Sequence, residues 1–344
     1  MTKDDFKELL ERVKGSTIAL VYIFEGESAP GFSHYHIWQG DVISGWLEAV
    51  QSLHCRPFLL DVRTFVEKGV SGTLPHIDYV LNLNCGSKEL SPMGLVPSTC
   101  AFLGIPCIPC DTTGIIVGEN KRLSNIIARD MGLSVPKELE QDSEDGIFRP
   151  LNFGSSYGVR RGARKNSLED GVYQEFIPGY DITTPYVFDP LANCFRPLPT
   201  ILYDPDSKDP NWYFGEEQKR NKTGYQRRII HGVTDDLDRM YQELISTFNV
   251  HTFCRIDARI RNRSNTSIEE LTAKPLGLDD LVFIEINTMP TVNGDNSFCH
   301  SFNSINEQDS IYHSIELIKQ FIGTVSPACY LLACSMIALL KAKC

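Results

Sequence analysis

Short apolar strands alternate with helix-forming segments through the first third of the chain. Strands are predicted at 16–24, 55–62, 79–85 and 106–110, and helices at 38–53 and 94–104. The strand segments are almost continuously apolar, as expected for strands covered on both faces. Parallel strands need a crossover between them, so this order predicts a small doubly wound parallel sheet over residues 15–115.

Two further α/β units follow this sheet. The second opens with GENKRLSNIIARDMGLSVP, in which a helix is predicted to end at Gly132. The third contains a helix at 235–248, for which Thr234 is the predicted N-cap. Two strands follow, 252–261 and 281–287, which a polar connection joins. A chain of this length can hold three units, and the predicted domains are 1–116, 117–195 and 196–344.

Composition and charge argue against several classes of protein. The net charge of −11 disfavours nucleic acid as a partner, because no basic block exceeds the short RRGARK at 160–165. The opening MTKDDFKELLERVK is charged and amphipathic, so no signal peptide is expected. The apolar part of the C-terminal PACYLLACSMIALLKAKC is too short to span a bilayer and predicts a packed helix, with a subunit interface, and hence a homodimer, as the alternative.

The cysteines indicate a reducing compartment. Their number is odd, eleven, which fits the cytoplasm better than a disulfide framework. Cys107 and Cys110 form a lone CxxC in an apolar context, where a redox or zinc role is the less favoured interpretation. We therefore expect a soluble cytoplasmic protein without membrane or nucleic-acid partners.

The strand VFIEIN carries a carboxylate and an amide two positions apart. Strand side chains alternate, so Glu285 and Asn287 share one face while Val282, Ile284 and Ile286 share the other. A buried carboxylate needs a partner, and two oxygen ligands suit a hard cation such as Mg²⁺. A half-exposed edge strand with a polar face is the alternative.

A neighbouring predicted strand adds to this polar face. It carries Asp257 with Arg255 beside it. Three oxygen ligands and a cation on one face are harder to explain as packing than the two oxygen ligands of a single strand.

Two turns carry weaker signals. NFGSSYGVRRG at 152–162 places hydroxyls in a glycine turn, whose backbone N–H groups can wrap phosphate oxygens. VYQEFIPGYDI at 172–182 is a strand and turn whose backbone groups can bind a flat base, with Asp181 accepting from a ribose hydroxyl. An ordinary glycine turn and a plain strand-turn are the alternatives.

Taken in order, five segments resemble the D-alanine–D-alanine ligase branch of the ATP-grasp superfamily. They are GENKRLSNIIARDMGLSVP, FRPLNFGSSYGV, YQEFIPGYDITTPYV, RIDARI and EINTMP. The resemblance covers nearly the whole chain. It implies a three-domain α/β fold that clasps ATP between the central and C-terminal sheets, with Mg²⁺ expected as two ions that Mn²⁺ can replace. It also implies a ligase that joins a carboxylate to an amine through an acyl phosphate.

The resemblance also implies roles for individual residues. Nucleotide contacts are implied for Lys121, Arg149, Ser155, Ser156, Gln174, Glu175, Ile177, Asp181 and Lys219, and Mg²⁺ ligands for Asp257, Glu285 and Asn287. Catalytic roles are implied for Arg255, which would steady the oxyanion, and for Ser156 and Lys219 beside the reacting phosphate. Arg149 departs from the lysine usual in the family, which exchanges a point charge for a planar fork. Residues 205–224 are polar and rich in turn formers, which suits a mobile loop closing over the nucleotide.

The substrate-facing elements depart from the family. The glycine turn and amine-binding glutamate of the first domain are replaced by FEGESAPGFSHYHIWQGD, and Cys85 stands at a histidine position. The predicted substrate contacts are Glu27, Ser28, His36, Asn296 and Ser297. We therefore expect an amino-acid ligase of specialised metabolism, acting on a small-molecule carboxylate and amine other than two D-alanines. A small-molecule kinase and a non-catalytic nucleotide-binding protein are the alternatives.

Overall fold

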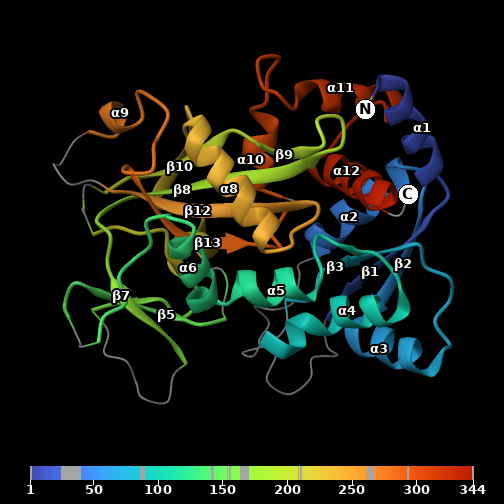
Figure 1. Ribbon diagram of the computed structural model, residues 1–344, viewed down its shortest axis with the longest axis horizontal. Helices are drawn as coiled ribbons and strands as arrows, with labels where there is room; N and C mark the ends of the chain where they lie inside the picture. Colours follow the sequence, from blue (N-terminus) through green and yellow to red (C-terminus); the bar gives the residue numbers. More distant parts are fainter. Residues whose placement is uncertain are drawn as a thin grey trace.

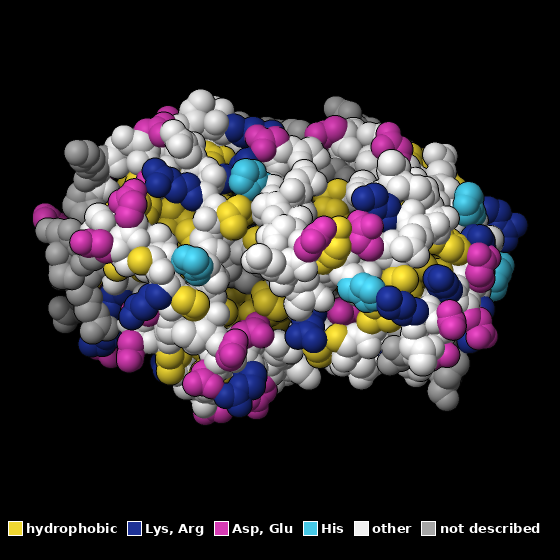
Figure 2. Space-filling view, turned by 90° about the horizontal axis from the view of Figure 1, so that it is seen from above, with side chains coloured by type: hydrophobic (Ala, Val, Ile, Leu, Met, Phe, Trp, Pro, Cys, Tyr) yellow, Lys and Arg dark blue, Asp and Glu magenta, His cyan; other side chains and the backbone are white. Residues whose placement is uncertain are grey.

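The computed structural model contains three sheets. It describes residues 2–24, 40–85, 90–140, 143–152, 154, 156–162, 170–207, 209, 211–261, 267–292 and 294–342. The first sheet lies at one end of the molecule, and the other two lie together at the opposite end (Figure 1). On the face shown in Figure 2, basic and acidic side chains are intermixed.

The first sheet is parallel, as its strand and helix order predicts. Its strands are β1 (Thr17–Tyr22), β2 (Arg56–Asp61), β3 (Tyr79–Asn82) and β4 (Cys107–Ile108), in the order β2-β1-β3-β4. Its helices are α1 (Lys3–Val13), α2 (Gly40–Ser52), α3 (Val62–Ser71) and α4 (Leu90–Leu103). Side chains of β1 alternate between two cores: Ile18 and Leu20 pack with α2, and Ala19 and Val21 pack with α3 and α4. The predicted doubly wound arrangement is confirmed.

The last helix, α12 (Pro327–Ala342), completes the first of these cores. Its residues 328–337 are buried, and the helix packs against α1, α2 and strand β8 (Gly179–Asp189). The prediction of a packed terminal helix is therefore confirmed.

Across the described ranges no single helix has the length and apolar composition to cross a membrane; α11 (Tyr312–Ile322) and α12 pass that test only as a pair, with a bend of 97° between them.

A small antiparallel sheet follows two connecting helices. The helices are α5 (Thr112–Glu119) and α6 (Lys121–Asp130), and the strands are β5 (Gly146–Pro150), β6 (Arg160–Arg161) and β7 (Gly171–Glu175), in the order β6-β5-β7. Helix α6 is followed by Gly132 with a φ of 89°, the conformation that favours glycine after a helix. This confirms the predicted end of that helix.

The largest sheet is antiparallel and carries most of the site. Its strands are β8 (Gly179–Asp189), β9 (Cys194–Pro197), β10 (Thr200–Pro205), β11 (Tyr225–Ile230), β12 (Phe253–Arg261) and β13 (Leu281–Asn287), in the order β11-β10-β8-β12-β13 with β9 paired to β8. The remaining helices are α7 (Glu216–Asn221), α8 (Asp235–Thr247), α9 (Ile268–Leu271) and α10 (Ser297–Asn303). The domain division at 195 stays a prediction, and strands from both sides of it share this sheet.

Helix α8 covers one face of the large sheet. Leu237, Tyr241 and Leu244 are buried and pack in one core with residues of β8 and β12, as the helical spacing predicts. Thr234 occupies the N-cap position, but its side chain makes no capping hydrogen bond. Because this face of the sheet is covered, the polar side chains of β12 and β13 lie on the other.

Shortening a buried side chain of α12 should destabilise the whole protein. Leu332 is fully buried in the core that α12 shares with α1 and α2. We expect Leu332→Ala to lower the free energy of unfolding by about 2–5 kcal/mol, through lost burial and the cavity left behind. Leu95→Ala is the matched control, because Leu95 is a helical leucine that is 44% exposed. Urea denaturation measures both, and equal losses would contradict the packing described.

Candidate active site

A cavity of about 320 Å³ lies between the small and the large antiparallel sheets. It is lined by many of the predicted site residues: Lys121, Arg149, Ser156, Gln174, Glu175, Ile177, Asp181, Lys219, Arg255, Asp257, Glu285, Asn287, Asn296 and Ser297. Ser155, Glu27, Ser28 and His36 lie outside the described residues. The fold thus brings together residues separated by up to about half of the chain, although their roles remain predictions.

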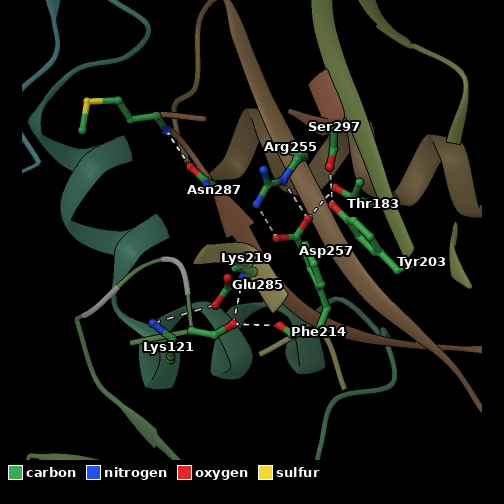
Figure 3. Close-up of polar contacts among 12 residues, drawn as sticks. Lys121, Thr183, Tyr203, Phe214, Lys219, Arg255, Asp257, Glu285, Asn287 and Ser297 are labelled. Atoms are coloured by element: carbon green, nitrogen blue, oxygen red, sulfur yellow. Dashed lines mark hydrogen bonds and ion pairs between the residues drawn. The ribbon is translucent and has the colours of Figure 1, made fainter. Parts of the chain in front are cut away.

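Glu285 sits at the centre of a group of cations. Its Oε2 atom lies 2.5 Å from Nη2 of Arg149 on β5. The same atom lies 3.8 Å from Nζ of Lys121 at the start of α6 (Figure 3). Burial acts to raise the pKa of Glu285, but the charges of Lys121, Arg149, Lys219 and Arg255 lower it to about 2. The carboxylate is therefore ionised at neutral pH.

Strand β13 contains a bulge beside Glu285. Asp257 of β12 pairs with Glu285, whereas the next residue, Ala258, pairs with Phe283. Ile284 is therefore the extra residue; it borders the cavity, and its carbonyl accepts from Nη1 of Arg149 at 3.2 Å. The strict alternation predicted for this strand is wrong at Ile284, because the bulge interrupts it.

Asp257 is held by two neighbours. Arg255 donates from Nε to Oδ1 at 2.9 Å and from Nη2 to Oδ2 at 2.8 Å, and Thr183 of β8 donates to Oδ1 at 2.5 Å (Figure 3). Burial disfavours the charged guanidinium, but the Asp257 carboxylate raises the pKa of Arg255 above its ordinary value. The paired fork uses two of the three guanidinium nitrogens and leaves Nη1 for a further acceptor.

The glycine turn meets the predicted closing loop, of which residues 211–222 are called the lid here. Ser156 has a φ of 61°, and its hydroxyl donates to the carbonyl of Phe214 at 3.0 Å. Lys219 of α7 donates from Nζ to the same hydroxyl at 2.8 Å. Burial lowers the pKa of both Lys219 and Lys121 below the ordinary value of lysine. The turn and the lid thus bring a hydroxyl and an ammonium to the cavity together.

The far end of the cavity is formed by β7 and the start of β8. Gln174 is 2% exposed; its Nε2 donates to the carbonyl of Pro136 at 3.5 Å, while its Oε1 has no hydrogen-bond partner among the described residues. Asp181 accepts at Oδ2 from Nη1 of Arg259 at 2.6 Å and from the amide of Phe214 at 2.7 Å. Arg259 was not predicted from the sequence, although it shares the strand face of Arg255 and Asp257.

The cavity is also lined by a group of aromatic side chains that was not predicted from the sequence. The ring of Tyr203 stacks on Phe214 with centroids 3.9 Å apart, and Tyr225 packs edge-on against both rings. Tyr203 also shares a short hydrogen bond with Ser297, and burial raises the pKa of Tyr203 to about 12. These rings come from β10, the lid and β11, so no local motif joins them.

Two residues predicted to bind substrate or metal also have local partners. Asn296 caps α10 by accepting from the amide of Cys299 at 3.0 Å, and Asn287 accepts from the amide of Met289 at 3.1 Å. Nearby, Arg227 of β11 pairs with Asp295 at 2.6 Å.

The oxygen atoms of Asp257, Glu285 and Asn287 suit Mg²⁺ by their chemistry. They border one cavity from neighbouring strands, and Oε1 of Glu285 takes no part in the contacts with Arg149 and Lys121. Among the described residues, however, no cluster of three or more His, Cys, Asp or Glu side chains could hold a metal alone. Since four cations act on Glu285, the site favours an anion over a bare cation.

The sequence matches no protein-family model and no curated protein. Solved structures do match the fold. D-alanine–D-alanine ligase from Bacillus anthracis, complexed with ATP, is 14% identical with a TM-score of 0.61, covering 96% of this chain and 99% of that one. VanG D-Ala:D-Ser ligase from Enterococcus faecalis is 14% identical with a TM-score of 0.58, covering 95% and 99%. The chain has the fold of D-alanine–D-alanine ligases.

A third structure with this fold is D-alanyl-alanine synthetase A from Vibrio cholerae O1 biovar eltor. It is 14% identical, with a TM-score of 0.57, and covers 90% of this chain and 99% of that one. The resemblance and the ATP-grasp fold predicted from the sequence are therefore confirmed. At this identity the likeness concerns the fold of the D-alanine–D-alanine ligases and not the substrate.

The environment of Glu285 predicts a specific dependence of stability on pH. A carboxylate whose pKa is lowered on folding stabilises the protein above its unfolded pKa, and this contribution is lost as the pH falls through the folded value. For Glu285 that window runs from the ordinary value of 4.5 down to about 2. The stability advantage of the wild type over Glu285→Gln should therefore shrink by about 1 kcal/mol between pH 7 and pH 4.

Urea denaturation across this pH range measures the difference. Glu269→Gln is the matched control, since Glu269 is an exposed carboxylate that also pairs with an arginine. A wild-type advantage over Glu285→Gln that stays constant from pH 7 to pH 4 would contradict the assigned environment.

Proposed function

We propose that the protein is an ATP-dependent ligase that joins a carboxylate to an amine through an acyl phosphate. The observation that carries this proposal is the set of four cations, Lys121, Arg149, Lys219 and Arg255, around Glu285 in one cavity. In enzymes that transfer a phosphoryl group, cations of this kind neutralise the negative charge on that group. The fold supports it, because the matched structures include a D-alanine–D-alanine ligase complexed with ATP and a D-Ala:D-Ser ligase.

The nucleotide is proposed to lie across the cavity from Gln174 to Glu285. The unpartnered Oε1 of Gln174 would accept from the exocyclic amine of adenine, since a buried acceptor otherwise costs free energy. Both contacts to Asp181 use Oδ2, so Oδ1 remains for a ribose hydroxyl. Lys121 and Arg149 would then contact the phosphates.

Asp257, Glu285 and Asn287 would hold Mg²⁺, which would neutralise charge on the phosphates during transfer. The surplus of cations in the cavity favours entry of the metal together with the triphosphate. Arg149 and Lys121, which now neutralise Glu285, would then turn toward the phosphate oxygens.

The reaction proposed has two displacements. An oxygen of the substrate carboxylate forms a bond to the γ-phosphorus, and the bond to the ADP oxygen breaks. The amine nitrogen then forms a bond to the acyl carbon, the carbon–oxygen bond to phosphate breaks, and the amine proton passes to the phosphate or to solvent. Arg255 would donate from Nη1 to the oxyanion, an effect of about 3–4 kcal/mol per donor in other enzymes. Ser156 and Lys219 would position the γ-phosphate.

The proposed substrates are amino acids or related molecules larger or more polar than D-alanine. The end of the cavity beyond Arg255 is bordered by Tyr203, Tyr225 and the Arg227–Asp295 pair. Rings and a charged pair are more than a pocket for two methyl groups needs. We place such a ligase in the cytoplasm and in specialised metabolism.

Loss of the central carboxylate should abolish turnover. We expect Glu285→Gln to reduce ADP formation by about a hundredfold or more, because a neutral amide balances neither the surrounding cations nor Mg²⁺. ADP release by the purified variant in Mg²⁺ buffer is the measurement, and circular dichroism verifies folding. Glu269→Gln should keep wild-type activity. Turnover by Glu285→Gln at the wild-type rate would rule out the metal and phosphate assignment.

A substrate screen separates ligase from kinase. ADP release and product mass are measured with ATP, Mg²⁺ and pairs of carboxylates and amino acids. We expect amine-dependent turnover, with D-alanine alone giving at most about a tenth of the best rate, since a site built for polar partners rejects substrates lacking them. D-alanine dimerisation faster than every other pair would contradict the proposed specificity. Phosphoryl transfer that needs no amine would indicate a kinase instead.

A further inference from the structure

Arg259 is a buried guanidinium in the floor of the cavity. Side chains of β12 alternate, so Arg259 shares a strand face with Arg255 and Asp257, while Ala258 and Ile260 lie in the core. Arg259 is only 5% exposed. Burying a charge is costly unless it is paired and hydrogen-bonded, so its partners show what it holds.

Three of those partners lie in the turn after β7 and at the start of β8. Arg259 donates from Nε to the carbonyl of Ile177 at 2.8 Å, from Nη2 to the carbonyl of Gly179 at 2.8 Å, and from Nη1 to Oδ2 of Asp181 at 2.6 Å. Its guanidinium also lies 5.0 Å from the ring centroid of Phe176. The guanidinium thus fixes the segment that would carry the base and the ribose.

The fourth partner belongs to the lid. Arg259 donates from Nη2 to the carbonyl of Trp212 at 2.9 Å. Two residues on, the amide of Phe214 donates to the same Asp181 oxygen that Arg259 contacts, at 2.7 Å. The Arg259–Asp181 pair therefore binds the lid backbone at two points.

These contacts continue to the phosphate end of the cavity. The carbonyl of Phe214 accepts from Ser156, whose hydroxyl accepts from Lys219. Lys219 also lies 5.1 Å from the ring centroid of Phe214. Holding Trp212 and Phe214 in place therefore also holds Lys219.

We propose that Arg259 is a positioning residue that fastens the lid over the cavity and sets the place of Lys219. The turn-rich composition of 205–224 predicts a mobile loop, and the contacts of Arg259 and Asp181 would hold its lid part in place. Only the expected effect on catalysis rests on the proposed ligase function; the contact between Arg259 and the lid does not. A ribose hydroxyl on Oδ1 of Asp181 would then join the nucleotide to the same fastening.

Hydrogen exchange in the nucleotide-free protein tests the fastening directly. Arg259→Met keeps much of the length of the side chain and removes every donor. We expect amide exchange in peptides covering 211–222 to become about tenfold faster or more, because charge-assisted bonds to Trp212 and Asp181 are lost. Arg228→Met is the matched control, since Arg228 is exposed on β11 and pairs with Asp204 and Glu269 instead. It should leave lid exchange unchanged.

Arg259→Lys provides a second variant that keeps the charge. A single ammonium cannot reproduce the planar fork, so we expect the amide exchange rate of the lid to lie between the rates of Arg259→Met and the wild type. Should Arg259→Met fail to fold, Arg259→Lys against Arg228→Lys decides the question alone. Lid exchange in the Arg259 variants that equals the wild-type rate would overturn the proposal.

Kinetics then separate this inference from the proposed function. With an active wild type, we expect Arg259→Met to raise the KM for ATP and to lower kcat, with partial rescue in Arg259→Lys. A wild type that forms no ADP with any substrate pair, combined with faster lid exchange in Arg259→Met, would reject the ligase and leave the lid fastening intact. Unchanged lid exchange in an active enzyme would reject the fastening and leave the ligase intact.

Discussion

Two carboxylates that face each other across β12 and β13 determine the organisation of the molecule. Asp257 and Glu285 are paired in register, and burying two carboxylates is costly unless cations pair with them. The cations arrive from separate elements: Arg255 from the same strand, Arg149 from β5, Lys121 from α6 and Lys219 from the lid. The charges on one strand pair are thus balanced by cations from the small sheet, a helix and the lid, which meet at one place.

The sequence predicted those parts of the site that follow from local periodicity. Alternation along β12 and β13 placed Asp257, Glu285 and Asn287 at one cavity, and continuous apolar strands predicted the parallel sheet. Alternation also places Arg259, the next polar residue of the strand, on the same face, but it does not indicate which groups Arg259 binds. Its partners lie 47 to 82 positions away in the chain, and only the fold reveals them.

Other features had no local signal. The bulge at Ile284 depends on how β13 pairs with β12, and the aromatic group of Tyr203, Phe214 and Tyr225 comes from three elements. Thr234 has the residue type of a cap but no capping bond, so sequence preference identified the start of the helix without the interaction. Tertiary contacts set these details.

The place of α12 has a consequence for synthesis of the chain on the ribosome. The helix comes last in the sequence, yet it covers the same core as α1, β1 and α2, which are made first. Domains generally fold as they emerge, but the apolar face formed by Trp46 and its neighbours lacks part of its cover until α12 has left the exit tunnel. The nascent first sheet therefore keeps part of its apolar surface open to water, and available to chaperones, until α12 has been made.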